Sequence, residues 1–325
     1  MSDDDFSFSK LAEWLWGMVF VNDSTQRLYW LYVFIFIAIS SCLYITRKPE
    51  SKSMLSFILP KKIFFSKSSF ADIQIYLING ALGIFINLAT LIASTALISE
   101  FFSRLLFFLF GETSNSIPFS HLVHLLFGIA ILLLTDFSVF ITHFLHHKLP
   151  VLWSFHKTHH SAEVLTPITA HRFHPVELVI NGLVLALCVG PIIGIYQYLF
   201  DMSFLIPGTI GVIMVLWLLT ANFRHSHIPL HFPNIISRWL VSPAMHNIHH
   251  STNPRHFDKN FGLIFSFWDR LAGTWYLPEK DENLKFGLPN EDSFKTAIGC
   301  YISPFRECYS RFQKFIRRFT ETKSP

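Results

Sequence analysis

Charged residues are scarce in this chain. Asp, Glu, Lys and Arg make up 15% of the 325 residues, whereas a soluble domain usually carries about 25%. Hydrophobic residues reach 51% and the mean hydropathy is +0.40. The formal charge of +4 is too small to indicate a nucleic-acid partner. The shortage of charge therefore argues against a soluble enzyme and predicts an integral membrane protein.

Cysteine motifs and nucleotide-binding loops are also missing. The four cysteines show no CxxC pairing, which gives no support for a disulfide framework or an iron–sulfur site. No GxGxxG loop of a flavin or nicotinamide domain is present. Any oxidation chemistry in this chain would therefore take its electrons from a separate protein.

Long apolar runs are abundant. A spanning helix needs about 20 mostly apolar residues, and we expect spans at about residues 28–45, 73–98, 121–141, 178–200 and 204–220. The last two form a tight hairpin, and the short run 101–110 is expected to be interfacial or re-entrant. The predicted fold class is all-α: a multi-pass membrane helical bundle with a histidine-rich cap.

The orientation of the bundle follows from its basic residues. The loop after the first apolar run holds Arg47, Lys48, Lys52, Lys61, Lys62 and Lys67. The positive-inside rule places this loop in the cytoplasm. Counting crossings from there brings the chain back to the cytoplasmic side just before His143 and again before His225, so the histidine-rich regions share one face.

Histidine is the most informative residue type. The stretch HFLHHKLPVLWSFHKTHH, residues 143–160, holds six of the 17 histidines. Helical spacing of i, i+3 and i+4, which places side chains on one face, recurs in three groups: His143 and His147; His156, His159 and His160; His246, His249 and His250. Eight imidazoles could bind two metal ions, although ligand type alone does not name the metal.

Asp136 is the catalytic candidate outside the histidines. An ionisable residue inside an apolar span suggests function. It precedes His143 by seven residues, nearly two helical turns, so both lie on one face. We expect Asp136 to accept a ring N–H and fix the tautomer of a metal ligand. The alternative is an acid near a helix end that water reaches.

These motifs resemble the fatty acid hydroxylase/sterol desaturase superfamily of membrane di-iron enzymes, over about residues 135–278. The resemblance includes the three histidine groups and the segment TAHRFHPVE, with Arg172, His174 and Glu177. It also includes the closing segment NFGLIFSFWDRLAGTWY, with Asn260, Gly262, Trp268, Asp269, Gly273 and Thr274 in matching places. Where the family has an HxN-like element, His225 matches the histidine and His227 replaces the asparagine.

The resemblance implies a site, its cofactors and its partners. Two iron ions would be held by His143, His147, His156, His159, His160, His174, His225, His246, His249 and His250. Dioxygen would be the co-substrate, and a cytochrome b5-like or ferredoxin-like protein would donate electrons. The substrate would be a lipid (a sterol, an ether lipid or a fatty acyl chain) that is hydroxylated or desaturated. His174 is expected either as a ligand or as a supporting group, and His146 is not expected to bind metal.

The implied organisation has three parts: membrane helices and a basic loop in residues 1–120, the catalytic domain in 121–278, and a basic tail in 279–325. In the tail, RFQKFIRRF carries Arg311, Lys314, Arg317 and Arg318. This segment could dock an acidic electron carrier, but anionic lipid headgroups are the favoured partner.

Three other functions are compatible with histidines in a membrane protein. A divalent-metal transporter would place its ligands near the bilayer midplane on interrupted helices, whereas the histidines here follow the apolar runs. A b-type cytochrome needs histidines on facing helices within the bilayer, which the close spacing fits poorly. A noncatalytic metal-binding protein is the third alternative.

Overall fold

The computed structural model describes residues 29–49, 53–83, 94–112, 121–200, 221–279 and 282–321. Within these ranges the chain is helical and has no strand; an isolated bridge pairs Leu240 with Phe265. Three helices are long and apolar enough to cross a membrane: α2 (Trp30–Arg47), α8 (His121–Lys148) and α10 (Pro175–Phe200). The all-α membrane-helical fold predicted from the sequence is confirmed.

The second predicted span, residues 73–98, is not one helix. Helix α5 (Lys67–Ala81) ends in a turn at Leu82, and a separate helix, α7 (Thr95–Phe110), begins after Ser94. The Ser94 hydroxyl accepts a hydrogen bond from the Leu97 N–H, which is the usual way a serine starts a helix. Residues 101–110, expected as a separate segment, form the second half of α7. The fifth predicted span, 204–220, lies outside the described residues.

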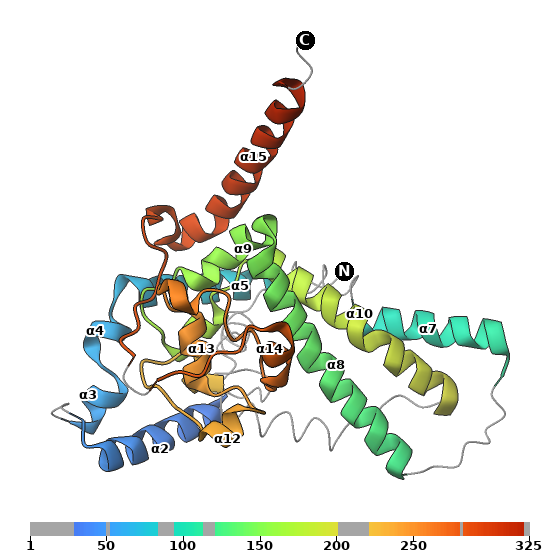
Figure 1. Cartoon of the computed structure of the whole chain (residues 1–325), viewed down its shortest axis with the longest axis horizontal. Helices are drawn as coiled ribbons and strands as arrows, with labels where there is room; N and C mark the ends of the chain where they lie inside the picture. Colours follow the sequence, from blue (N-terminus) through green and yellow to red (C-terminus); the bar gives the residue numbers. More distant parts are fainter. Residues whose placement is uncertain are drawn as a thin grey trace, which may run out of the picture.

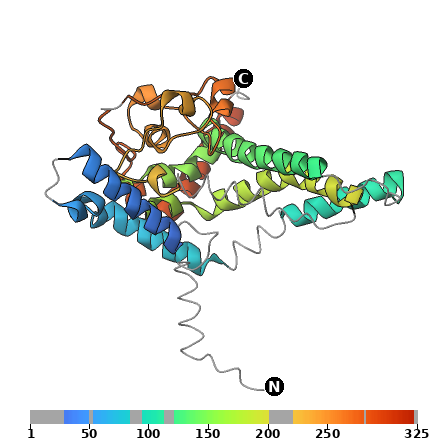
Figure 2. The ribbon, with the colours of Figure 1, turned by 90° about the horizontal axis from the view of Figure 1, so that it is seen from below.

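Helices α7 and α10 pack very closely. Gly190 and Gly194 lie four residues apart on α10, the spacing that lets membrane helices approach each other. A Cβ atom on Gly190 would lie 2.6 Å from Ile98 Cγ2, and one on Gly194 would lie 2.5 Å from the Ser99 carbonyl oxygen. Since α10 also packs against α8, the three helices extend together from one side of the body (Figures 1 and 2).

The rest of the described chain forms short helices joined by loops. These are α3 (Met54–Ile58), α4 (Lys61–Phe64), α9 (Pro150–His160), α12 (Asn234–Ser237), α13 (Pro243–His249) and α14 (Phe267–Ala272), with 3-10 turns η1 (Pro167–His171), η2 (Pro254–His256) and η3 (Asp292–Phe294). We call α9, α13, α14 and their loops the cap. The last helix, α15 (Ala297–Glu321), packs against α9 and then projects away from the body (Figure 1).

Arg172 joins α9 to α5 and to the segment before α15. Its side chain is fully buried and its Nη1 lies 2.7 Å from Asp72 Oδ1 on α5. Its Nε donates to the Thr158 carbonyl on α9, and its Nη2 donates to the Phe294 carbonyl just before α15. A buried charge is tolerated when it is paired and fully hydrogen-bonded, so this guanidinium holds α9 in a fixed position.

Candidate metal centre

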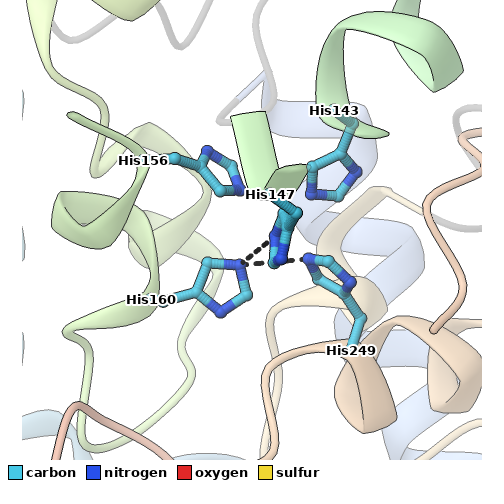
Figure 3. Close-up of side chains that lie close together, drawn as sticks. All are labelled: His143, His147, His156, His160 and His249. Atoms are coloured by element: carbon cyan, nitrogen blue, oxygen red, sulfur yellow. Dashed lines mark hydrogen bonds between the residues drawn. The ribbon is translucent and has the colours of Figure 1, made fainter. Parts of the chain in front are cut away.

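The structure gathers nine histidines into two groups. One group holds five, namely His143, His147, His156, His160 and His249, and the other holds four, namely His159, His225, His246 and His250. Within each group one nitrogen from every ring lies within 4.8 Å of the others. In the five-histidine group the rings come from α8, α9 and α13 and point toward a common centre (Figure 3). Nine of the ten ligands predicted from the sequence are therefore brought together.

The nitrogens are very close to one another. His160 Nε2 lies 3.1 Å from His147 Nε2 and 3.0 Å from His249 Nε2. In the four-histidine group, the Nε2 atoms of His225, His246 and His250 form a triangle whose three sides are each 3.1 Å. The His159 Nε2 atom lies 3.2 Å from that of His225.

These separations are those of ligands around a metal ion. Imidazole nitrogens bind at about 2.0–2.1 Å from zinc, so two neighbouring ligands are about 3.0 Å apart at a right angle and about 3.4 Å apart at a tetrahedral angle. A neutral imidazole has one N–H. Each inward-facing nitrogen carries either a proton or a lone pair, so the three contacts of the triangle cannot all be hydrogen bonds. A cation at the centre would bind all three lone pairs.

Two of the rings are held by backbone carbonyls. The Nδ1 atom of His249 donates to the Lys259 carbonyl over 2.8 Å, and that of His143 donates to the Phe261 carbonyl over 3.0 Å. Because a carbonyl oxygen only accepts, the proton in each ring is on Nδ1 and the inward-facing Nε2 is a bare lone pair. Outer partners of this kind orient metal-ligating histidines.

A carboxylate holds a third ring. Glu177, in the first turn of α10, accepts from His156 Nδ1 over 2.7 Å, and both side chains are buried. The second carboxylate oxygen, Oε2, has no hydrogen-bond partner among the described residues. His147 Nδ1 lies 3.7 Å from Asp258 Oδ1. The sequence motif included Glu177 without a role, and nothing in the sequence pointed to Asp258.

The closing segment of the motif shapes the loop that supplies these carbonyls. Asn260 lies between Lys259 and Phe261 and adopts a left-handed conformation with φ of 58°. Its Nδ2 donates to the Met245 and Tyr276 carbonyls. Asp269 accepts from the N–H groups of Phe261 and Gly262. The matched residues Asn260 and Asp269 therefore position the two carbonyls that hold His249 and His143.

Gly262 allows this loop to close. A Cβ atom at this position would lie 2.8 Å from the Phe265 carbonyl oxygen and 2.9 Å from Asp269 Oδ2. Either contact is too short for a methyl group, so a larger residue would push the Asp269 carboxylate away from the loop. The glycine in the sequence motif is thus explained by a close approach to the acid.

Asp136 does not contact a histidine ring. Its carboxylate accepts from the Ile264 and Phe265 N–H groups and from Trp268 Nε1. The expectation that it accepts the ring N–H of a metal-ligating histidine is therefore wrong. Seven residues of helix separate Asp136 from His143 by about 10 Å along the axis, which is too far for a shared hydrogen bond. We call residues 259–262, which supply the Lys259 and Phe261 carbonyls, the carbonyl loop. Asp136 instead anchors the segment that follows this loop.

Eight of the 17 histidines lie outside both groups, and three of them, His174, His146 and His227, lie in or beside the histidine motifs. His174 Nδ1 accepts from the Val176 N–H, and its Nε2 lies 3.2 Å from the Tyr301 carbonyl. His146 Nδ1 donates to the Thr142 carbonyl, and His227 Nε2 donates to the Phe57 carbonyl. At the HxN-like element it is His225 that lies in a group. His174 is therefore left out of the ligand set proposed below.

The buried rings of His160, His246, His249 and His250 are electrically neutral at neutral pH. Burial, followed by the neighbouring imidazoles, lowers the pKa of His160, His246 and His249 well below the usual value. Burial and His147 lower the pKa of His250 to about 3. Neutral imidazole is the form that binds a metal ion.

A cavity of about 280 Å³ runs from the histidines into the space between α8 and α10. We call it the helix cavity. At one end it is lined by His143, His156, His159, His225 and His246. Toward the membrane-spanning parts of the two helices its walls include Val139 and Leu185. Ligand pockets typically combine an apolar lining with a few polar groups, and here the polar end coincides with the histidine groups.

Part of the chain is similar in sequence to known proteins. Residues 128–274 match the family model named fatty acid hydroxylase. Human lathosterol oxidase is 27% identical over 155 residues, which cover 47% of this chain and 46% of that protein. A Delta(7)-sterol 5(6)-desaturase of Gibberella zeae is 30% identical over 152 residues, covering 46% and 37% respectively. An alkylglycerol monooxygenase of Xenopus tropicalis is 26% identical over 155 residues, covering 47% and 31%.

The matched segment thus spans less than half the length of each of these relatives. No solved structure matches the chain. The matched residues 128–274 include both histidine groups, Glu177 and the carbonyl loop. Over residues 128–274, the chain is therefore similar to the fatty acid hydroxylase family, and the relatives with which it aligns are a lathosterol oxidase, a sterol desaturase and an alkylglycerol monooxygenase.

Proposed function

We propose that this chain is a membrane-embedded, dioxygen-dependent lipid oxidase that hydroxylates or desaturates its substrate with two iron ions. The proposal rests on one observation: two groups of converging, neutral imidazoles lie at the end of an apolar cavity between two membrane-spanning helices. The relatives named above are lipid oxidases or desaturases by name. A transporter or a noncatalytic metal-binding protein is not favoured by these similarities.

In the proposed centre each histidine group holds one iron ion. The five-histidine group would supply His143, His147, His156, His160 and His249, and the four-histidine group would supply His159, His225, His246 and His250. Imidazole suits iron among several transition metals. When bound, such a metal pair activates dioxygen for hydrogen abstraction from an unactivated C–H bond.

The overall reaction fixes what the protein must supply. Hydroxylation converts one C–H bond, dioxygen, two electrons and two protons into a C–OH group and one water. Desaturation uses the same inputs, removes two hydrogens from neighbouring carbons and releases two waters. Both outcomes need two electrons from outside the lipid, and in the proposal these come from a separate carrier protein.

The protein's own residues bind and orient. The lipid would enter from the bilayer between α8 and α10 and extend along Val139 and Leu185, with the carbon to be oxidised beside His143 and His156. Lys259, Phe261 and Glu177 hold ligand rings in fixed orientations. The apolar wall excludes water from the reacting carbon. The basic residues that follow α2 support a cytoplasmic location for the centre.

Metal content and lipid oxidation test the proposal together. Protein purified in mild detergent from iron-supplemented cells is expected to hold close to two iron ions per chain. Lipid extracts from cells with and without the gene should differ by one oxidised product. The His249→Ala variant should lose metal and product, since His249 Nε2 lies 3.0 Å from His160 Nε2 in the five-histidine group.

His227→Ala is the matched control. It removes a partly buried imidazole two residues after His225 but outside both groups, so metal content and product should stay near the wild-type level. Full metal content in His249→Ala, or an unchanged product, would contradict the proposed centre. Zinc at two ions per chain would support the ligand set but leave the native metal to be identified by activity after iron loading.

A further inference from the structure

A second cavity, of about 320 Å³, reaches the histidine groups from another side. We call it the cap cavity. Its walls include His147, His160, His249 and His250. None of these four lines the helix cavity, and none of the five grouped histidines there lines this one. The nine grouped rings therefore form a partition between two cavities.

The cap cavity lies near the C-terminal end of α8, and we call the part of its rim around Asp258 the mouth. Lys148 is the last residue of that spanning helix, and its Nζ lies 2.5 Å from Asp258 Oδ2. The Asp258 side chain lines the cavity and is 43% exposed. Ser251 and Thr252 add polar lining. Its other walls include Trp153, Phe257, Leu288 and Pro289, so this cavity is enclosed by the cap and by residues 287–289, and not by membrane-spanning helices alone.

The surface around the mouth combines an apolar centre with basic residues. Phe257 lines the cavity and is 58% exposed. Arg255 and Lys259 flank it in sequence, and Lys285 is brought beside it because its carbonyl accepts from the Thr252 N–H. An exposed aromatic within a charged rim is typical of a protein interface.

Three acids lie in this region: Asp258, Glu282 and Glu279, of which Glu279 lies near Tyr276 together with Arg255. Asp258 pairs with Lys148, and Glu282 accepts from the Tyr276 hydroxyl over 2.6 Å and lies 3.5 Å from His256. Both Arg255 and Lys285 are exposed. Among the described residues, Arg255, Lys259 and Lys285 outnumber the carboxylates of Glu279 and Glu282, while Lys148 and Asp258 offset each other. The rim therefore carries a small net positive charge, which is complementary to an acidic partner.

We propose that this surface, formed by Arg255, Phe257, Lys259 and Lys285, docks an acidic one-electron carrier protein. The inference rests on the proposed function, which needs two electrons per turnover. The carrier docks twice, is oxidised by one electron each time, and passes each electron to the proposed metal pair. Docking here brings it beside Trp153, whose ring centroid lies 4.8 Å from that of His147 and 5.4 Å from that of His160.

The arrangement separates the two inputs of the reaction. Lipid uses the cavity between the membrane helices, and the soluble carrier uses the cavity that opens in the cap. Neither has to leave before the other binds. The basic residues of α15 are the competing site, and Figure 1 shows the end of that helix projecting away from α13 and α14.

Charge reversal tests the docking surface on the full-length protein in detergent. The probe is a reduced plant-type [2Fe–2S] ferredoxin, used as an acidic one-electron carrier. The Arg255→Glu/Lys285→Glu variant should bind ferredoxin about tenfold or more weakly at low ionic strength, since steering by complementary charge changes association by 10–10³-fold. Its oxidation of ferredoxin without oxygen or lipid should slow by a similar factor. Wild-type binding should weaken as salt is added.

The matched control is Arg311→Glu/Lys314→Glu, two exposed basic residues on α15. It should bind and oxidise ferredoxin like the wild type. An equal loss in both variants, no loss in the first, or no binding by the wild type would overturn the docking surface. Chemical reduction by dithionite distinguishes the failure of the two proposals. If dithionite cannot reduce the metal-loaded wild type, the proposed function is overturned, and the docking surface for an electron carrier is overturned with it.

Discussion

The two cavities that meet at the histidine groups are built from different parts of the fold. The helix cavity is enclosed by side chains of two long membrane helices, α8 and α10. The cap cavity is enclosed by loops and by short helices, with Ser251, Thr252 and Asp258 among its walls. Rigid apolar helices suit a lipid, and polar loops suit exchange with water and proteins. In the proposed function, this difference lets one metal site receive a lipid from the bilayer and electrons from the water-facing side.

Removing one of the grouped histidine rings should have the largest effect on lipid oxidation and on iron content. His160 lines the cap cavity, and its Nε2 lies within 3.1 Å of both His147 Nε2 and His249 Nε2. We expect His160→Ala to lower lipid oxidation by more than about 100-fold, because changing even an outer partner of a metal ligand typically costs 10–100-fold. Iron per chain, measured by mass spectrometry, should fall by about one of the two proposed ions.

His146→Ala provides the comparison for that loss. His146 is buried, like His160, but it lines the helix cavity and belongs to neither histidine group. Its Nδ1 donates to the Thr142 carbonyl. This variant should keep both iron ions. Equal metal loss in the two variants would mean that burial of the rings, rather than membership of a group, explains the effect.

The outer partner of His156 should have the next largest effect. Glu177 lies on the helix-cavity side, where its Oε1 accepts from His156 Nδ1. Glu177→Leu should reduce metal affinity by about 10–100-fold. Glu177→Gln should lose less, since its amide oxygen can still accept from Nδ1. Competition with a chelator gives both affinities, and the reverse order would show that Glu177 does not act through His156.

Narrowing one cavity at a time should separate lipid binding from reduction. Leu185→Trp places a larger ring in the wall of the helix cavity. Overpacking typically costs about 1–3 kcal/mol, so lipid should bind about 5–150-fold more weakly with unchanged iron content. Thr252→Trp narrows the cap cavity instead and should leave lipid affinity unchanged. Equal effects of both substitutions on lipid titrations would contradict separate entrances.

Helix patterning gave much of the fold from sequence. The apolar runs at 28–45, 121–141 and 178–200 correspond to α2, α8 and α10, because a span needs about 20 apolar residues and little else. The run at 73–98 was misread as one helix. Its average apolarity hides the end of α5 at Ala81 and the Ser94 cap that starts α7, and both are local features that a long window cannot resolve.

Histidine spacing gave most of the candidate site. The i, i+3, i+4 pattern places rings on one helix face regardless of tertiary structure, and all eight histidines that it named lie in the two groups. The ninth, His225, came from the family resemblance, which also named His174. The spacing could not divide the rings between the groups: adjacent His159 and His160 belong to different ones. That division depends on how α8, α9 and α13 pack.

The outer partners were the least predictable part. Asp136 was assigned to a ring because it shares a helix face with His143, but its carboxylate contacts the backbone of residues 264 and 265 instead. The partners of His249 and His143 are backbone carbonyls, which every residue has. Asp258, at the mouth of the cap cavity, follows an unremarkable loop sequence and is found only from the fold.

Removing the Asp258 charge should have the smallest effect. The neighbouring His147 ring and the Lys148 ammonium lower the pKa of Asp258 to about 2. A carboxyl whose pKa is depressed in the folded state adds stability above its unfolded pKa of about 3.9, and this stability is lost as pH falls toward 2. Because the side chain is 43% exposed, Asp258→Asn should lower the free energy of unfolding by at most about 1 kcal/mol at pH 7.

Thermal melting of both proteins in detergent measures this difference. The gap between wild type and Asp258→Asn should be constant above about pH 5 and should narrow as pH falls below about 4, where the wild-type carboxyl begins to gain a proton in the unfolded chain. Iron content should stay the same, since His147 keeps its inward-facing Nε2 contact with His160. A loss of metal in Asp258→Asn would instead make this exposed acid an essential support of the His147 ring. The histidines that line the cap cavity would then depend on their outer partners as strongly as those that line the helix cavity depend on Glu177.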